Sequence, residues 1–316
     1  MPNKAWQNTL RGNFTLVIDI CPQWRYYINS GLSEEVIELA VVSITILVEN
    51  TVLQPELLAE HGFAALVNVN GRKILFDTGA GHTLISSAGV LGIDLTNVSA
   101  VVLSHGHYDH TGGLRDFLKL HGPVDVYAHS DVFSERYTIK KDAAPEYIGI
   151  GWTREQLQNE GAMLNLLTTP AELEEGVFLT GAIPRLTPYE KISSKFQVKS
   201  NSGWEQDKIL DDQALVIRSS KGIVVISGCA HAGLINTLKH VQLLTGEKKI
   251  HAFFGGTHLN GVTNERIKRT VEALDEFDLD IVGAGHCTGF EASVALYNEL
   301  GSKFACIPVG NVFELE

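Results

Sequence analysis

The chain has few cysteines, an excess of acidic over basic residues, and no long apolar run. Four cysteines in 316 residues (Cys21, Cys229, Cys287 and Cys306) are too few and too scattered for a disulfide scaffold, and they favour a reducing, cytoplasmic compartment. The formal net charge of −12 argues against nucleic acid as a partner, because phosphate binding needs a basic face. No apolar run approaches the roughly 18 residues that cross a bilayer. Neither membrane insertion nor export is therefore expected.

The composition is that of a folded protein with a large core. Hydrophobic residues make up 44% of the chain and charged residues only 20%, which argues against disorder. Residues 1–38 differ from the rest because they carry aromatic side chains without a clear period. They form an N-terminal extension, either a dimerisation or lid segment or a stretch that packs loosely on the surface. The sequence does not fix the oligomeric state.

Strand and helix patterns alternate from Val41 onward. Two hairpins are predicted, one across the type I′ signal Asn70-Gly71 and one through residues 219–222, and the final third alternates helix and strand. Two such blocks predict an α/β fold with two packed sheets and helices outside, a four-layer αβ/βα sandwich over residues 39–316. Residues 131–212 have the least regular pattern, so we expect an irregular insertion there, of the kind that is usually functional.

The strongest functional motif is Ser-His-Gly-His-Tyr-Asp-His-Thr-Gly-Gly at residues 104–113, directly after a short apolar strand. Positions two apart in an extended segment point the same way, so His105 and His107 can grip one divalent ion. Asp109 and His110 lie on the following turn and can reach a second ion. The alternative, that these are solvated loop residues, fits a lone histidine better than three histidines and an aspartate at this spacing.

These residues resemble the metallo-β-lactamase superfamily, whose signature is H-x-H-x-D-H. The resemblance covers about residues 41–310 and includes Phe-Asp-Thr-Gly at 76–79, Ser-Gly-Cys at 227–229 and Gly-His at 285–286. It implies the four-layer fold, two divalent ions, Asp109 as ligand and catalytic group, and His286 as the last ligand. Asp77 would support the site from behind, a role compatible with a simple turn-capping aspartate. Zinc suits a histidine-rich set best, although carboxylates also suit manganese or iron.

The chain departs from the family in the third ligand of the first metal. The loop that usually supplies a histidine should lie before Ala214, where this chain has Asp211 and Asp212. We predict that His231 takes the role, with Asp212 as the alternative. Cys229 occupies the family's bridging position, either as a ligand or as a small buried residue near the metals.

Five further segments, at residues 176–185, 211–215, 228–233, 255–259 and 286–289, are similar to one branch of the superfamily. That branch includes a synthase of methanopterin biosynthesis, which implies a phosphorylated or pterin-like small-molecule substrate. A hydrolase of the phosphodiesterase or lactonase type, or a non-catalytic metabolite-binding module, is the alternative. His258 would contact substrate or shuttle a proton. Candidates for a substrate phosphate, unless they are merely exposed cations, are Arg185, Lys191 and Lys195. The remaining histidines expected to be structural or exposed are His61, His82, His240 and His251.

Overall fold

The computed structural model of the chain describes residues 15–21, 24–29, 41–200 and 203–315. The chain divides into two units, Met1–Glu38 and Leu39–Glu316. In the first unit, strands β1 (Thr15–Cys21) and β2 (Trp24–Asn29) pair antiparallel. The dimerisation, lid and surface-packing roles considered for residues 1–38 lie largely outside the described residues.

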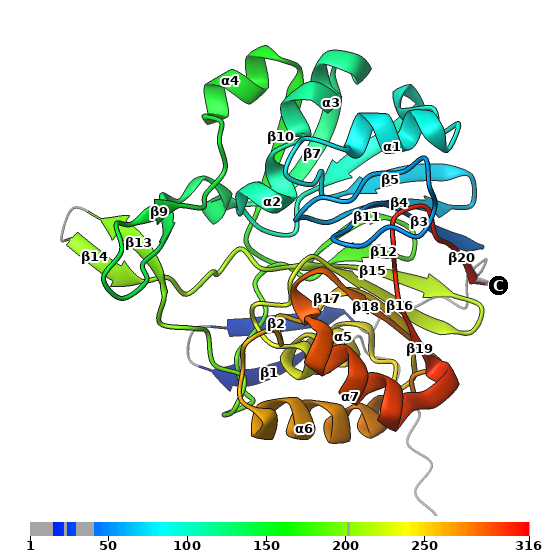
Figure 1. Cartoon of the computed structure of the whole chain (residues 1–316). Coiled ribbons are helices and arrows are strands. Elements are labelled where there is room, and N and C mark those ends of the chain that lie inside the picture. Colours follow the sequence, from blue (N-terminus) through cyan, green and yellow to red (C-terminus); the bar gives the residue numbers. More distant parts are fainter. Residues whose placement is uncertain (1–14, 22–23, 30–40, 201–202, 316) are drawn as a thin grey trace, which may run out of the picture. The chain divides into compact units, whose positions relative to one another are not determined.

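The second unit is built on two seven-stranded sheets, which lie one above the other in Figure 1. The first has the order β10-β7-β6-β5-β4-β3-β20, made of β3 (Val42–Val48), β4 (Ala64–Val69), β5 (Arg72–Phe76), β6 (Val98–Val102), β7 (Val124–His129), β10 (Ala162–Leu167) and β20 (Val312–Leu315). The second has the order β11-β12-β15-β16-β17-β18-β19, made of β11 (Ala171–Glu174), β12 (Val177–Leu179), β15 (Ala214–Ser219), β16 (Gly222–Ser227), β17 (Ile250–Gly256), β18 (Ile281–Gly285) and β19 (Phe304–Ala305).

Helices cover the outer face of each sheet (Figure 1). Beside the first sheet lie α1 (Leu84–Val90), α2 (Tyr108–Thr111), α3 (Leu114–His121) and α4 (Arg154–Asn159), and beside the second lie α5 (Leu234–Thr245), α6 (Asn264–Ala273) and α7 (Phe290–Leu300). Alternation along β4 shows how the layers form: Ala65 and Val67 join the core between the sheets, while Leu66 packs under the helices. The predicted four-layer αβ/βα sandwich is confirmed.

The predicted hairpins are also present, and their turns explain the register. Asn70 and Gly71 both have positive φ, 50° and 87°, as a type I′ turn requires, and β4 and β5 pair antiparallel across them. The second hairpin joins β15 and β16. Among the described residues, none of the helices has the length and apolarity needed to cross a membrane.

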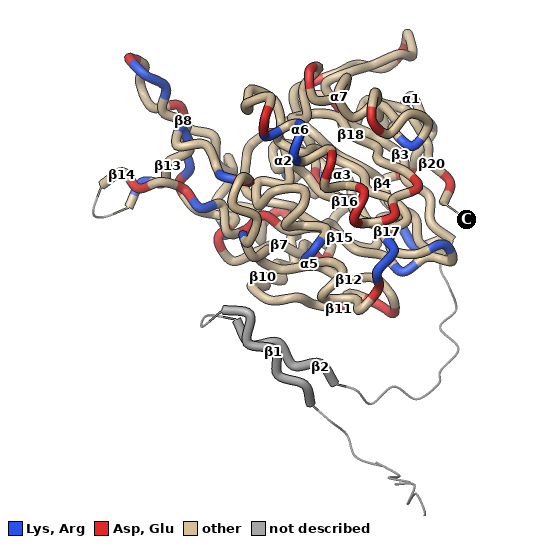
Figure 2. Tube along the Cα trace, turned by 90° about the horizontal axis from the view of Figure 1, so that it is seen from below, with Lys and Arg blue, Asp and Glu red and all other residues tan. Residues whose placement is uncertain are grey.

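Residues 131–212 are more regular than the sequence suggests. Strands β10, β11 and β12 extend the two main sheets, and a separate four-stranded sheet has the order β14-β13-β8-β9. Its strands are β8 (Arg136–Thr138), β9 (Glu146–Tyr147), β13 (Phe196–Ser200) and β14 (Gly203–Gln206). These strands are two to five residues long, too short to show a period. We call them the small sheet; Figure 2 shows it projecting from the sandwich, with Lys and Arg residues along β8 and its loop.

A buried ion-pair network anchors the small sheet. Arg136 on β8 is 1% exposed, and its guanidinium donates to Asp207 at 2.9 Å and doubly to Asp211 at 2.7 Å. The same Asp211 carboxylate accepts a hydrogen bond from the backbone N–H of Gly106 at 2.7 Å. Burial opposes the charge on Arg136, but the two carboxylates outweigh it and raise the pKa of the guanidinium. The network therefore ties the small sheet to the histidine-rich loop after β6.

Removing Arg136 should be strongly destabilising, because it leaves Asp207 and Asp211 buried without their countercharge. We expect Arg136→Ala to lower the free energy of unfolding by about 3–5 kcal/mol, measured by urea unfolding followed by circular dichroism. The matched control is Arg72→Ala, since Arg72 also pairs with a carboxylate, Glu174 at 2.6 Å, but is 53% exposed. That change should cost no more than about 1 kcal/mol. Equal losses in the two variants would contradict an anchoring role.

Candidate metal centre

The chemically active side chains gather where strands of the two sheets end. Asp77 follows β5, the 104–113 motif follows β6, Cys229 follows β16, His258 follows β17 and His286 follows β18. Strands β5 and β6 are parallel neighbours, as are β16, β17 and β18, so their carboxyl ends meet at one edge of the sandwich. Three of these loop residues have positive φ without being glycine: Asp77 (59°), His258 (48°) and His286 (50°). Such strained backbone is concentrated at functional sites.

A first ligand set consists of His105, His107 and His231. The Nε2 atom of His105 lies 3.0 Å from Nδ1 of His107, and one ring nitrogen of each of the three lies within 4.8 Å of the others. Burial lowers the pKa of all three rings well below the usual value, so they are neutral. The Nε2 atom of His231 is buried with no hydrogen-bond partner among the described residues. Neutral, unpartnered imidazoles facing one point are what a divalent cation requires.

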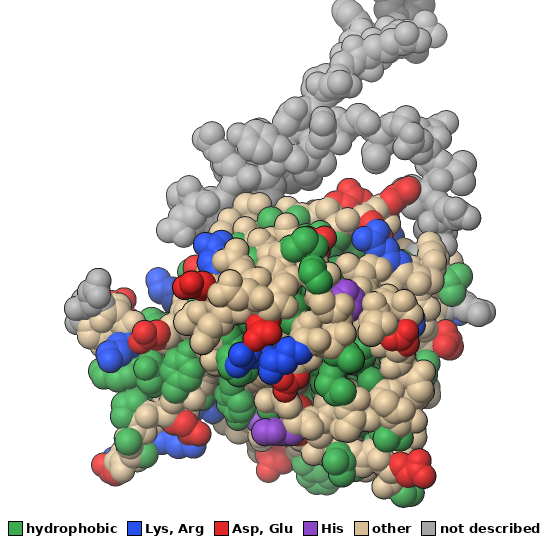
Figure 3. All heavy atoms as spheres, turned by 90° about the horizontal axis from the view of Figure 1, so that it is seen from above, with side chains coloured by type: hydrophobic (Ala, Val, Ile, Leu, Met, Phe, Trp, Pro, Cys, Tyr) green, Lys and Arg blue, Asp and Glu red, His purple; other side chains and the backbone are tan. Residues whose placement is uncertain are grey.

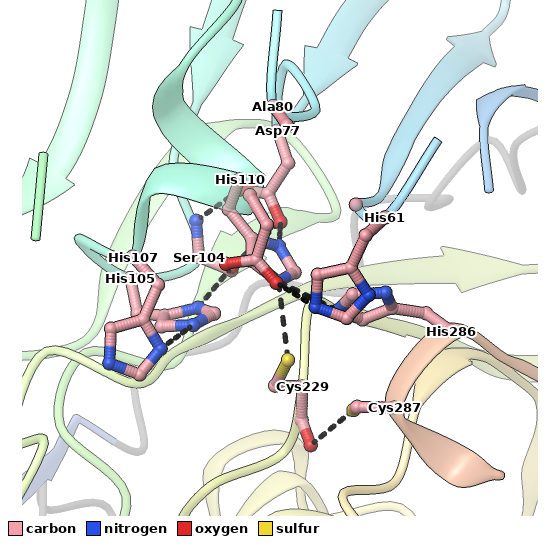
Figure 4. A network of polar contacts seen from close by, with 12 residues as sticks. His61, Asp77, Ala80, Ser104, His105, His107, His110, Cys229, His286 and Cys287 are labelled. Carbon is pink, nitrogen blue, oxygen red and sulfur yellow. Dashed lines mark hydrogen bonds and ion pairs between the residues drawn. The ribbon is translucent and has the colours of Figure 1, made fainter. Parts of the chain in front are cut away.

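A second ligand set surrounds the carboxylate of Asp109, and Figure 4 shows two other members of it, His110 and His286. Its Oδ2 atom lies 3.4 Å from Nε2 of His286, 3.8 Å from Nε2 of His110 and 3.2 Å from Nε2 of His61. His110 Nε2 is in turn 3.2 Å from His286 Nε2 and 3.2 Å from the sulfur of Cys229. We use "second ligand set" for Asp109, His110 and His286, whose donor atoms converge as around a second cation.

Asp77 orients both sets from behind. It accepts hydrogen bonds from Nδ1 of His110 and from the Ser104 hydroxyl, each at 2.7 Å. The Ser104 oxygen lies 2.9 Å from Nδ1 of His105, and since its own proton goes to Asp77, it accepts from that ring. Nε2 of both rings is thereby left free for a cation. Gly228 makes room for this arrangement, because a Cβ there would lie 2.1 Å from the Ser104 hydroxyl oxygen.

Two residues at the site, His61 and Asn50, were not predicted from the sequence. His61 is exposed, as expected, but its ring faces Asp109 at 3.2 Å. The Asn50 side chain lies 2.9 Å from Nδ1 of His286 and 3.3 Å from Nδ1 of His61, so one amide orients both rings. Both residues lie in the segment between β3 and β4, which has no metal-binding spacing. No pattern in the sequence could have identified them.

The structure also bears on the choice between His231 and Asp212. Asp212 is buried beneath the His231 loop and accepts a hydrogen bond from the Ala232 N–H at 2.7 Å. Burial raises the pKa of Asp212 to about 6. Within the described part of the chain, the candidate ligand groups include His231 and not Asp212. The geometry thus favours His231 as the third ligand, with Asp212 supporting its loop.

The metal centre opens into a cavity of about 360 Å³. Its walls include His258, Lys140, Lys195 and Phe196, and the Phe196 ring lies 5.6 Å from that of His107. Lys195, a candidate for a substrate phosphate, thus lines the cavity. Arg185, the second candidate, does not line it, and its guanidinium donates to the backbone carbonyls of residues 208 and 209. Lys191 does not line this cavity.

Charges differ between the two sets. Burial disfavours the protonated form of His110, but the carboxylates of Asp109 and Asp77 outweigh it and raise its pKa to about 9. Burial likewise disfavours ionisation of Asp109, but His110, His286 and His61 hold its pKa well below the usual range. Without a cation, the second set is therefore a carboxylate paired with a protonated imidazole at neutral pH. The first set carries no such proton.

The chain is similar to known proteins in sequence and in fold. The family model of the metallo-beta-lactamase superfamily matches residues 58–183. The 7,8-dihydropterin-6-methyl-4-(β-D-ribofuranosyl)-aminobenzene-5′-phosphate synthase of Methanocaldococcus jannaschii is 30% identical over 81% of this chain and 90% of its own. An uncharacterised protein of that organism is 33% identical over 80% and 93%. Among solved structures, a metal-dependent hydrolase of the β-lactamase superfamily superposes with a TM-score of 0.74 and 28% identity, covering 87% of this chain and 99% of its own.

Metal affinity of the second set should depend on pH, because a cation must displace the proton of His110. We expect that affinity to rise about tenfold per pH unit and to level off near the pKa of about 9. Affinity of the first set should be flat across neutral pH, since its rings are already neutral. Asp77→Asn removes one of the carboxylates that raise the pKa of His110, so the metal affinity should level off at a lower pH than in wild type. On that plateau, the metal affinity of the second set should be 10- to 100-fold weaker than in wild type.

The metal affinity and the pH at which it levels off can both be measured by competition titrations of Zn²⁺ against a chromophoric chelator, from neutral to alkaline pH. Asp94→Asn is the matched control, because Asp94 is an exposed helix-capping aspartate that accepts from Thr96. A wild-type profile without slope, or identical profiles for the two variants, would contradict this account of Asp77 and His110.

Proposed function

This chain belongs to the metallo-β-lactamase superfamily, and from that premise we propose that it is a dinuclear metal-dependent enzyme acting on a phosphorylated or pterin-like small molecule. One observation carries the proposal: two adjacent ligand sets converge on one cavity. His105, His107 and His231 would hold one cation, and Asp109, His110 and His286 the other. Cys229, whose sulfur is within 4.8 Å of donor atoms of His105 and His110, lies between the sets. Five imidazoles beside one carboxylate favour zinc over manganese or iron.

The side chains of the site fit that chemistry. Two divalent cations held there supply Lewis acidity toward an electrophile and toward the negative charge that develops on it. Asp77 and Asn50 fix the rings that hold them. His258, in the cavity wall with its ring 4.3 Å from that of His231, is placed to exchange a proton with bound substrate. Phe196 covers the first set and limits access of water.

The substrate class is inferred from the cavity and the relatives together. Lys140 and Lys195 both line the cavity, and Lys140 pairs there with the Glu146 carboxylate at 3.6 Å. The ammonium group of Lys195 therefore suits an anionic substrate group. The relative named as a 5′-phosphate synthase supports a phosphorylated one. Acidic and basic side chains are interspersed on the face seen in Figure 3, so a small molecule fits better than a polyanion. The structure described as a metal-dependent hydrolase favours hydrolysis as the second candidate reaction.

A reducing compartment such as the cytoplasm suits the site. Cys229 and Cys287 are both buried free thiols at the cavity. Oxidation of the Cys229 thiol would remove it as a metal ligand.

Metal content should separate the roles of His231 and Asp212. His231→Ala removes a ligand of the first set, so we expect about one equivalent less metal than in wild type and loss of turnover, with the fold intact. Asp212→Asn, which alters only the support of the loop, should keep the full metal content. Inductively coupled plasma mass spectrometry and circular dichroism measure both properties. The opposite pattern, with metal lost only in the Asp212 variant, would assign the ligand to Asp212.

Turnover in a broad screen tests the enzymatic assignment itself. The purified protein would be offered phosphodiesters, phosphomonoesters, lactones, thioesters and pterin diphosphates, with and without chelator. We expect activity that chelation abolishes and zinc restores, on substrates with an anionic group, and a raised KM for such substrates in Lys195→Ala. Binding of metabolites without any turnover would identify a non-catalytic module. Turnover that survives complete metal removal would refute the proposal.

A further inference from the structure

A third group of potential ligands lies beside the two sets and is rich in sulfur. Cys229, His258 and Cys287 each follow one of three adjacent parallel strands, β16, β17 and β18. One donor atom of each lies within 4.8 Å of the other two. Cys287 belongs to neither ligand set. A His258 ring that holds a metal through one nitrogen keeps the other nitrogen for the proton exchange proposed above.

The surroundings of Cys287 indicate a built position for its sulfur. The thiol is buried and receives the backbone N–H of His258 at 3.2 Å, while it lies 3.7 Å from the carbonyl oxygen of Cys229. Figure 4 shows its sulfur pointing toward Cys229, whose own sulfur points toward His110. Gly256 provides the space, since a Cβ there would lie 2.5 Å from the Cys287 sulfur.

His258 supplies the third donor. Its Nδ1 is buried and has no hydrogen-bond partner among the described residues. Its ring lies against the rings of His231 and Phe196. A buried ring nitrogen without a partner is costly unless something else occupies it. The positive φ of His258, 48°, turns the residue back toward β18 and Cys287. Three strand ends thus deliver two sulfurs and an imidazole to one place.

We propose that Cys229, His258 and Cys287 form a third, thiolate-rich cation site for a thiophilic divalent metal such as Zn²⁺. Two thiolates and one imidazole with an open fourth position are a known zinc arrangement. On binding, each thiol loses its proton, so that two protons leave and the two thiolates neutralise the charge of the ion. The site shares Cys229 with the proposed dinuclear centre, and all three of its residues line the same cavity, so it would add a further Lewis acid there.

Cobalt titration of the metal-free, reduced full-length protein tests the site directly, because Co²⁺ bound to thiolate gives a near-ultraviolet charge-transfer band that histidine ligands do not. In wild type we expect about three equivalents to bind and the band to appear. Cys287→Ser should bind one equivalent fewer and lose about half of the band, and Cys229→Ser should lose all of it. Cys306→Ser, at an exposed free cysteine, should match wild type.

Several results would overturn the proposal. The first is an unchanged band and stoichiometry in Cys287→Ser, and the second is the absence of a band in wild type. The third is a Cys229–Cys287 disulfide that remains after the protein is treated with reductant. Cys287→Ala, with a thermal melt followed by circular dichroism, separates ligand loss from misfolding. His231→Ala should lose a different equivalent and keep the band. A band retained while the histidine sets fail to bind would therefore refute the proposed dinuclear centre and leave the thiolate site standing.

Discussion

The buried carboxylate of Asp77 is the constraint on which the metal centre depends. It fixes His110 directly and His105 through Ser104, so one charge sets the orientation of one ring in each ligand set. A buried charge of this kind persists only where it is fully hydrogen-bonded, and Asp77 also accepts from the Ser104 backbone N–H. The carboxylate lies at the end of β5, beside the parallel strand β6 that carries the histidine motif. The pairing of β5 with β6 therefore also sets the orientation of the His105 and His110 rings.

The two halves of the sandwich contribute differently to the centre. The first sheet supplies the compact motif of His105, His107, Asp109 and His110, all within one loop and one short helix. The second sheet supplies single residues from separate strand ends, among them His231, His258 and His286. Each of those strands is parallel to its neighbour, so loops far apart in sequence arrive at the same edge. Ions held there would bridge the two sheets as well as serve chemistry.

The small sheet makes the pocket more than a bare metal centre. Through Arg136 and Asp211 it is bonded to the backbone of Gly106, between two metal-site histidines. Its β13 carries Phe196 and its neighbour Lys195 into the cavity wall. A superfamily fold supports many reactions, and the parts that differ are those that contact substrate. The buried ion pair of Arg136 and Asp211 therefore couples the position of the small sheet to that of the first ligand set.

The sequence by itself determined the four-layer fold and the hairpins, and it indicated the candidate ligands of the 104–113 motif. Those features depend on local patterns: alternation of apolar residues, an Asn-Gly turn, and donors spaced two residues apart after a strand. It also indicated His231 by the absence of a histidine in the usual loop.

Only the tertiary structure brought in His61, Asn50 and Cys287, and only it placed Arg185 away from the cavity. The physical reason is the same for each. Their roles come from contacts across 11 to 236 positions of the chain, and no local period records such a contact. Short strands pairing with distant partners likewise hid the small sheet, since strands of two to five residues are too short to display a period of two clearly. Local features, such as the hairpins and the spacing of the histidine motif, can be identified in the sequence. Features that depend on which strand ends lie side by side are decided only when the sheets pack.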